Sequence, residues 1–191
     1  TPEWLDLLGS LGLITEVNGD MILRSARSIA KDGSSDSTNV MKAEYFVNYL
    51  WTNFAEFWSR DLCEKLSKLR FVPVRSAKSY SEDCVQQVEF RMYKDCSVPN
   101  DGDIVFHVRP ILRDTHVPPH IAWDHLGLKT PPPTRDVLRH VDALTKCPVD
   151  RWNWQNSLVK TFQSIFAYLQ KEWNDLSSSQ QRHLRSLRLI P

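Results

Sequence analysis

The chain has 191 residues, of which 41% are hydrophobic and 25% charged, and its 24 basic and 23 acidic residues leave a net charge of +1. This composition is typical of a folded protein with one sizeable core or two packed units, and it excludes the class of highly charged disordered chains. The balanced charge argues against a nucleic-acid binder and a membrane-surface protein, and no apolar run approaches the roughly 20 residues of a membrane helix.

Helical periodicity dominates the first 69 residues. Pro2 opens a short helix that Gly12 ends, and a second helix begins near Asn18 or Asp20. A polar loop leads to a long helix over about 40–57, after which Asp61 is expected to cap a shorter one. The inward stripe expected for the long helix consists of Phe46, Tyr49, Leu50, Phe54 and Phe57.

The hydrophobic period then changes from 3.6 to 2 residues. Phe71-Val72-Pro73-Val74 has the pattern of an edge strand, and the runs 86–93 and 103–109 alternate apolar with polar residues. Asn100-Asp101-Gly102 has the chemistry of a turn between those two runs. The pattern predicts one small antiparallel sheet, whose side chains packed on helices are Val88, Phe90, Ile104 and Phe106.

Helical periodicity returns in the second half of the chain. It predicts a short helix around 121–126, a helix that Thr134 caps, and a long helix over about 154–174. Ser177-Ser178-Ser179-Gln180 is typical of a capping box for a last helix. The inward residues expected are Val137, Val141 and Leu144 on the first of the long helices and Leu158, Phe162, Ile165, Leu169 and Trp173 on the second.

An internal repeat organises these elements. A shift of 115 residues aligns 11–58 with 126–173 without a gap and with eight identities, including Leu23-Arg24 with Leu138-Arg139 and Trp58 with Trp173. The prediction is an α+β, mainly α-helical chain of tandem helical units with a small antiparallel sheet between them. Unit one spans 1–114 (helical block 1–69, sheet 70–112), and unit two spans 115–191 and stops before its sheet. Leu11 and Leu126, and likewise Trp58 and Trp173, are expected in equivalent buried places.

Several motifs between Leu69 and Lys146 resemble the repeat region of sacsin-like proteins. The matching stretches are Arg70-Phe71-Val72-Pro73-Val74, Tyr93-Lys94-Asp95-Cys96-Ser97-Val98-Pro99-Asn100-Asp101, Val108-Arg109-Pro110-Ile111-Leu112, Trp123-Asp124-His125-Leu126-Gly127-Leu128, Pro131-Pro132-Pro133 and Val137-Leu138-Arg139-His140.

The resemblance implies a segment of a giant cytoplasmic co-chaperone. Such a segment would be non-enzymatic and would act as scaffold and client-contact module in protein folding or quality control. Its partners would be protein clients or co-chaperones, neighbouring repeats and the ATPase-like domains of the parent chain, with no nucleic acid and no membrane. The ATPase pattern of that family is absent, because the chain has only six glycines and no glycine-rich lid, so neither nucleotide nor another cofactor is expected.

Two residue patterns allow an enzymatic or metal-binding alternative. His116, His120 and His125 lie four and five residues apart, but Pro118 and Pro119 interrupt the run, so exposed or capping histidines are favoured over a zinc site. Arg135 and His140 have the Arg-x4-His spacing of HEPN-type ribonucleases, in which the His is the acid or base and the Arg steadies the phosphate. A solvated helix face is the favoured interpretation, and a cryptic ribonuclease or ATPase-linked module is the alternative.

Candidate protein contacts lie late in the chain. Trp152 packs at a unit boundary or, if exposed, contacts a partner. Because unit two stops before a sheet, apolar surface is expected to be bare at Leu184, Leu187, Leu189 and Ile190.

The cysteines indicate a reducing compartment. Cys63, Cys84, Cys96 and Cys147 form no Cys-x-x-Cys pair, and the chain has no Asn-x-Ser/Thr sequon, which favours buried thiols in the cytosol or nucleus. A disulfide between Cys84 and Cys96 across a hairpin is the alternative. No signal peptide is expected at the N-terminus.

Overall fold

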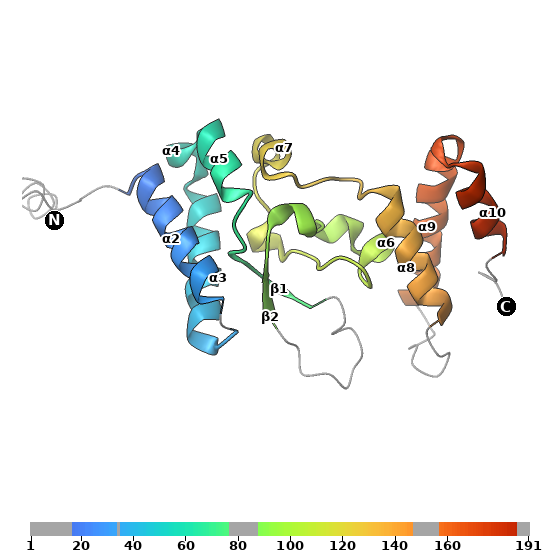
Figure 1. Cartoon of the computed structure of the whole chain (residues 1–191), viewed down its shortest axis with the longest axis horizontal. Helices are drawn as coiled ribbons and strands as arrows, with labels where there is room; N and C mark the ends of the chain where they lie inside the picture. The colour runs from blue at the N-terminus through green and yellow to red at the C-terminus, as the bar shows by residue number, and fades with distance from the viewer. Residues whose placement is uncertain (1–16, 34, 77–87, 147–156, 187–191) are drawn as a thin grey trace, which may run out of the picture.

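The computed structural model describes residues 17–33, 35–76, 88–146 and 157–186, and for 157 and 158 only the backbone. These residues form a row of three blocks, with one helical block at each end and a block of strands and short turns between them (Figure 1). The predicted class, mainly α-helical α+β with a small antiparallel sheet, is confirmed.

The first helical block contains α2 (Gly19–Asp32), α3 (Ser37–Thr52), α4 (Phe54–Phe57) and α5 (Arg60–Leu66). Of the two predicted starting points of α2, Asn18 is the cap, because its side chain accepts a hydrogen bond from the Met21 N–H at 3.1 Å. The predicted long helix is divided at Asn53, whose side-chain amide donates to the Tyr49 carbonyl. The predicted cap of α5 was wrong: Ser59 is the N-cap, and Asp61 lies inside the first turn.

The middle of the molecule contains β1 (Val72–Arg75) and β2 (Val88–Arg91), which pair antiparallel with Pro73 opposite Phe90. The third strand predicted over 103–109 was wrong. Gly102–Val105 is a helix, α6, and Ile104 and Val105 are both buried although they are neighbours in sequence. A strand would send them to opposite faces, whereas a helical turn between two packed elements can bury both.

Short turns complete this middle region. A parallel bridge joins Ser97 to Ile111, with hydrogen bonds from the Ser97 N–H to the Pro110 carbonyl and from the Leu112 N–H to the Ser97 carbonyl. We call residues 71–76 and 88–117 the strand–loop block. Its 3-10 turns are η2 (Tyr93–Asp95), η3 (Pro99–Asp101) and η4 (Asp114–His116), and η5 (His120–Ala122) and α7 (Trp123–Leu126) follow it.

The second helical block contains α8 (Thr134–Lys146), α9 (Ser157–Glu172) and α10 (Ser178–Ser186), with η7 (Trp173–Asp175) before α10. The predicted capping box is confirmed, because Ser177 Oγ accepts from the Gln180 N–H and Gln180 Oε1 accepts from the Ser177 N–H. Thr134 is the first residue of α8, and its hydroxyl is hydrogen-bonded to that of Tyr168. The predicted inward residues Val137, Val141, Leu144, Ile165 and Leu169 are buried.

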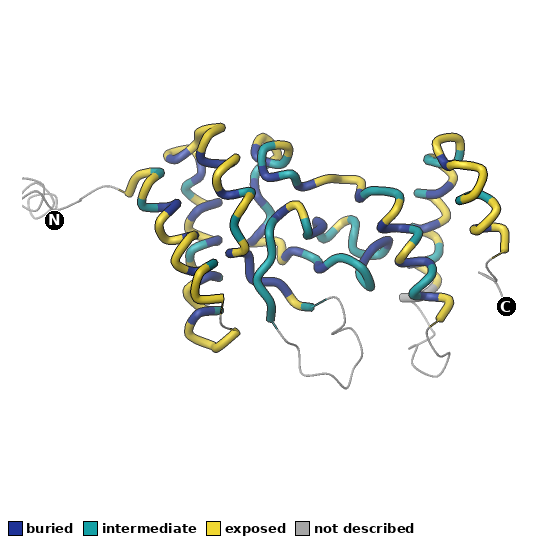
Figure 2. The backbone as a smooth tube through the Cα atoms, viewed as in Figure 1, coloured by how far each residue is buried: buried dark blue, intermediate teal, exposed yellow. Residues whose placement is uncertain are grey.

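Two hydrophobic cores lie along the row (Figure 2). The first joins α2, α3 and α5 to β1, Tyr93 and residues 122–128, and the second joins α8, α9 and α10 to α6. The cores do not divide at residue 114: Leu126 and Leu128 belong to the first core, and Ile104 and Val105 belong to the second. The strand–loop block therefore contributes to both cores.

The helix order of the first block recurs in the second, and burial agrees at many positions 115 residues apart. Equivalent buried pairs are Ile22 with Val137, Ala26 with Val141, Ile29 with Leu144, Leu50 with Ile165 and Phe54 with Leu169. The expected burial of Trp58 and Trp173 was wrong, because Trp58 is 36% exposed and Trp173 only half-buried. Leu11 lies outside the described residues. That the two units are structural repeats stays a prediction.

Candidate protein-contact surfaces and the joint between the two cores

A stripe of large side chains is exposed along α3. Met41, Tyr45 and Tyr49 are 55%, 74% and 40% exposed, and their spacing of four residues places them on one helix face. The expectation that Tyr49 points inward was wrong. We call these three residues the α3 stripe. Their spacing is visible in the sequence, but the stronger periodicity of the buried residues on the same helix obscures it.

A second stripe is exposed along α9. Val159 and Phe166 are 55% and 43% exposed, and Phe162 lies between them, half-buried, with its ring centroid 6.3 Å from that of Phe166. The residues lie at i, i+3 and i+7, so they share one face. Ile165 and Leu169, on the adjacent side of the same helix, are buried in the second core, and Phe162 packs partly against that core. We call Val159, Phe162 and Phe166 the α9 stripe.

The contact residues predicted from the sequence have different outcomes. Leu184 was expected to be bare, but it is only 6% exposed, because α10 packs it into the second core. Gln181 and His183 hold α10 there through hydrogen bonds to the Trp173 carbonyl and Asp142. Trp152, Leu187, Leu189 and Ile190 lie outside the described residues.

Arg109 joins the strand–loop block to the second helical block. Its guanidinium donates to Ser97 Oγ at 3.0 Å, to the Lys94 and Cys96 carbonyls at 2.5 and 2.6 Å, and to Asp136 Oδ2 at 2.9 Å. The side chains of Arg109 and Asp136 are 12% and 5% exposed. The alternating pattern of 103–109 had predicted Arg109 on the polar side of a strand. Arg109 and Asp136 are 27 residues apart in the sequence, and no sequence pattern indicates that they form an ion pair.

Buried histidines line the same joint. The ring of His140 is inaccessible, packs edge-on against Phe106 at 4.6 Å, and accepts a hydrogen bond from the His107 backbone N–H. Burial, and to a smaller extent the nearby His107 ring, lowers the pKa of His140 to about 3. The predicted solvated helix face was wrong for His140 and also for Asp136.

The ribonuclease alternative needs Arg135 and His140 at one accessible place. The Arg135 side chain is 80% exposed, whereas His140 is fully buried in the joint. An acid or base must lie within hydrogen-bonding distance of its substrate. The described arrangement does not bring the two side chains together at a surface.

The three histidines considered as a metal site, His116, His120 and His125, each have different neighbours. His116 is 2% exposed, and burial followed by the charge of Arg113 lowers its pKa, which corrects the expectation of an exposed or capping residue. His120 stacks on Trp123 at 4.0 Å, and His125 faces Trp58. Among the residues that the structure describes, no group of three or more His, Cys, Asp or Glu side chains could hold a metal ion.

Tyr93 anchors the strand–loop block to α3. It is fully buried, its hydroxyl accepts a hydrogen bond from Trp51 Nε1 at 2.6 Å, and it donates to the His116 carbonyl at 3.2 Å. Phe71 of the same block packs edge-on against Phe46 of α3 at 5.7 Å. These contacts cover the face of α3 that is opposite to the α3 stripe.

Two of the four thiols are described, and both are buried and free, as predicted. Burial raises the pKa of Cys63 to about 11 and that of Cys96 to about 12, so neither is a reactive thiolate at neutral pH. Cys84 and Cys147 lie outside the described residues, and so does one partner of the alternative disulfide.

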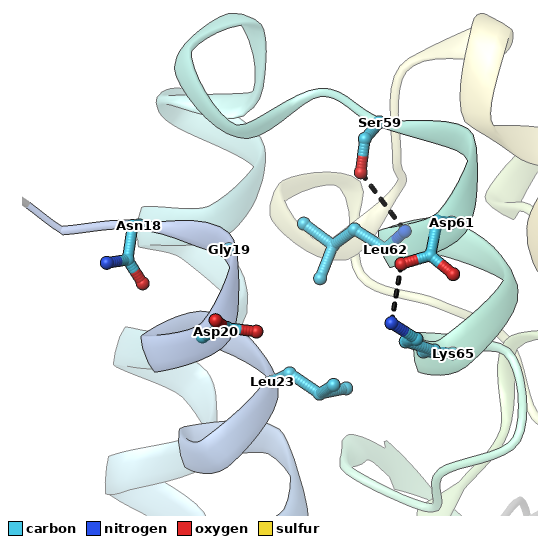
Figure 3. Close-up of a pocket in the computed structure, with 8 residues that line it drawn as sticks. All are labelled: Asn18, Gly19, Asp20, Leu23, Ser59, Asp61, Leu62 and Lys65. Carbon is cyan, nitrogen blue, oxygen red and sulfur yellow. Dashed lines mark hydrogen bonds and ion pairs between the residues drawn. The ribbon is translucent and has the colours of Figure 1, made fainter.

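A shallow cavity of about 370 Å³ lies between α2 and α5 (Figure 3). Asp20 and Asp61 face it from the two helices, and the single lysine at its wall, Lys65, is paired with Asp61 at 2.5 Å. The two carboxylates would repel an anion in this cavity. The N–H of Met21 in the first turn of α2 already donates to Asn18, so it is not available to bind one. This cavity offers no arrangement of an acid, a base and a nucleophile.

No helix of the described part of the chain is long and apolar enough to span a membrane. Comparisons with known proteins found no matching family model, no similar curated protein and no similar solved structure. The resemblance to sacsin-like repeats therefore stays a prediction that depends on its sequence motifs.

Proposed function

We propose that this chain is a non-enzymatic scaffold segment that acts through protein contact, as a sacsin-like co-chaperone segment would. The α3 stripe is the observation that carries the proposal. Three large side chains, between 40% and 74% exposed, lie in a line on a helix that is firmly held by the first core on its other side.

The chemistry of the α3 stripe suits unfolded polypeptide. Tyr side chains offer large contact area at a low entropic cost, and Met adapts its shape to irregular apolar partners. Surfaces of that composition bind many sequences rather than one. The expected clients are therefore unfolded chains that expose apolar residues, and no nucleotide is required.

A heat-aggregation assay with a model client and the full chain tests the proposal. Without nucleotide, a stoichiometric amount of the wild-type chain should suppress light scattering. The Tyr45→Ser/Tyr49→Ser double variant should lose most of the suppression, while Ile121→Ser, which removes an apolar side chain that is 60% exposed elsewhere, should keep it. Exposed substitutions of this type change the free energy of unfolding by about 0.5 kcal/mol or less, so thermal melts should agree among the three proteins.

Two results would contradict this function. One is wild-type protein that leaves aggregation unchanged at equimolar client. The other is equal suppression by the wild-type chain and the α3 double variant, which would assign the activity to another surface.

A further inference from the structure

The α9 stripe has an equivalent on α3, and that equivalent is covered. The 115-residue shift places Glu44, Val47 and Trp51 of α3 at the positions of Val159, Phe162 and Phe166. Val47 is 0% exposed and Trp51 9% exposed, whereas Phe166 is 43% exposed.

The strand–loop block provides the cover on α3. Tyr93 accepts the hydrogen bond of the Trp51 indole, and β1 and η4 pack along the same helix. Arg113, just before η4, forms an ion pair with Glu44 at 2.5 Å. The buried state of this α3 face therefore depends on a block that follows the helices in sequence.

The core-facing residues of the two helices also correspond, although α9 has α6 of the strand–loop block as an additional neighbour. Leu50 and Ile165 are equivalent and fully buried, and Phe54 and Leu169 are equivalent and nearly buried. The two helices thus turn equivalent residues towards their cores. They differ in the adjacent face, which is covered on α3 and carries the exposed Val159 and Phe166 on α9. Figure 1 shows the strand–loop block beside α3, and α9 at the far end of the row with α8 and α10 next to it.

We propose that the α9 stripe is a docking surface for a strand–loop block built like residues 71–76 and 88–117. Its occupant presents aromatic side chains where Phe71 and Tyr93 lie on α3. It differs from the present block at two points. Val159 replaces Glu44, so the position of Arg113 is filled by an apolar residue, and Phe166 replaces Trp51, so no indole N–H meets the side chain at the position of Tyr93. The proposal concerns α9 and does not rest on client binding by α3.

The test supplies a block of this build within the full chain, in which Leu189 takes the position of Phe71 and Arg113 is retained for the charge test below. Residues 74–117 are appended after Pro191, because Leu187–Pro191 align with Leu69–Pro73. Hydrogen exchange of the α9 amides is then measured by mass spectrometry, with α2 as the internal check that the protein is folded. Docking should slow exchange over 159–166 by about tenfold or more.

A charge pair makes the test specific. In the extended protein, Val159→Glu should restore the pairing with the appended Arg113 and slow exchange further than Val159→Lys does. The difference should shrink in 1 M salt, since a partly exposed ion pair is screened. Phe166→Asp should abolish the protection, and Tyr45→Ser on the α3 stripe should leave it unchanged.

Three results would overturn the proposal. The first is no protection of α9 in the extended chain whose α2 exchanges normally. The second is protection that Phe166→Asp does not remove, or that is the same in Val159→Glu and Val159→Lys. The third is concentration-dependent self-association of the unextended chain that Phe166→Asp abolishes, because the occupant would then be a second copy of this chain.

Discussion

At the scale of the single residue, Arg109 joins the strand–loop block to α8, a role that its position in the sequence does not indicate. It has four hydrogen-bond partners, and the only carboxylate among them is that of Asp136. A buried ion pair adds little net stability relative to apolar residues, but removal of one partner leaves the other charge in a medium of low dielectric.

Asp136→Ala should therefore lower the free energy of unfolding by roughly 3–5 kcal/mol, measured by urea denaturation. Asp61→Ala is the matched control, because it removes a pair of similar length between side chains that are 72% and 48% exposed. That change should cost about 1 kcal/mol or less. Equal costs for the two variants would contradict the role given to the joint.

The buried histidines predict the response of stability to acid. The folded-state pKa values of His107, His116 and His140 are lowered by burial, so between about pH 3 and 6.5 the unfolded chain binds more protons than the folded one. Stability should be greatest above pH 6.5 and should fall as the pH decreases through that value.

His140→Gln tests the contribution of one histidine. The glutamine amide oxygen can still accept the hydrogen bond from the His107 N–H, but the amide does not titrate in this pH range. Between pH 6 and 4 the slope of unfolding free energy against pH should be smaller than that of the wild type by about 1.4 kcal/mol per pH unit, one proton. The slopes come from urea titrations at several pH values. An unchanged slope would mean that His140 is protonated in the folded state.

At the scale of the elements, two helices end at a glycine in the left-handed conformation. Gly127 ends α7 with a φ of 72°, and a Cβ there would lie 3.1 Å from Lys94 Cβ. Gly33 ends α2 with a φ of 56°, but its nearest neighbour would be 3.8 Å away.

Both Gly→Ala changes should be destabilising, since the left-handed conformation costs other residues about 1–2 kcal/mol. Gly127→Ala should cost more than Gly33→Ala, because it adds a contact with the strand–loop block to the strain. Thermal unfolding of the two variants gives the comparison. A larger loss for Gly33→Ala would mean that Lys94 moves aside without cost.

The sequence predicts the helices well because their signals are local. Asn18, the Ser177–Gln180 box and the periodic residues of α8 each act within a few positions of the chain. The third strand failed for the opposite reason. Ile104 and Phe106 alternate with polar neighbours, but contacts of α6 with both α8 and α9, distant in sequence, favour a helical turn that buries Val105 as well.

The candidate surfaces were predicted less well than the fold. Leu184 was expected to be exposed because unit two was predicted to stop before a sheet, yet α10 folds back on the second core and buries this side chain. The α3 and α9 stripes depend on which arc of each helix a neighbouring block covers. No pattern within either helix contains that information.

At the scale of the whole molecule, the two cores should open separately. Few apolar residues connect them, since α6 supplies most of the strand–loop block's share of the second core. Local opening requires only the contacts of one cooperative unit to break.

Ile165→Ala and Leu50→Ala test this at equivalent, fully buried positions of the two cores. Each should cost about 2–5 kcal/mol locally. Hydrogen exchange should accelerate mainly in α8–α10 for Ile165→Ala and mainly in α2–α5 for Leu50→Ala. The same acceleration over the whole chain in both variants would show one cooperative unit instead.

The Arg109 joint also has a geometric consequence. A planar guanidinium that makes four hydrogen bonds to fixed acceptors permits few orientations, so it sets the angle between the strand–loop block and α8 rather than only holding them together. Salt screens a pair this deeply buried only weakly. Partners bound at opposite ends of the row would accordingly keep the same relative direction over a wide range of ionic strength.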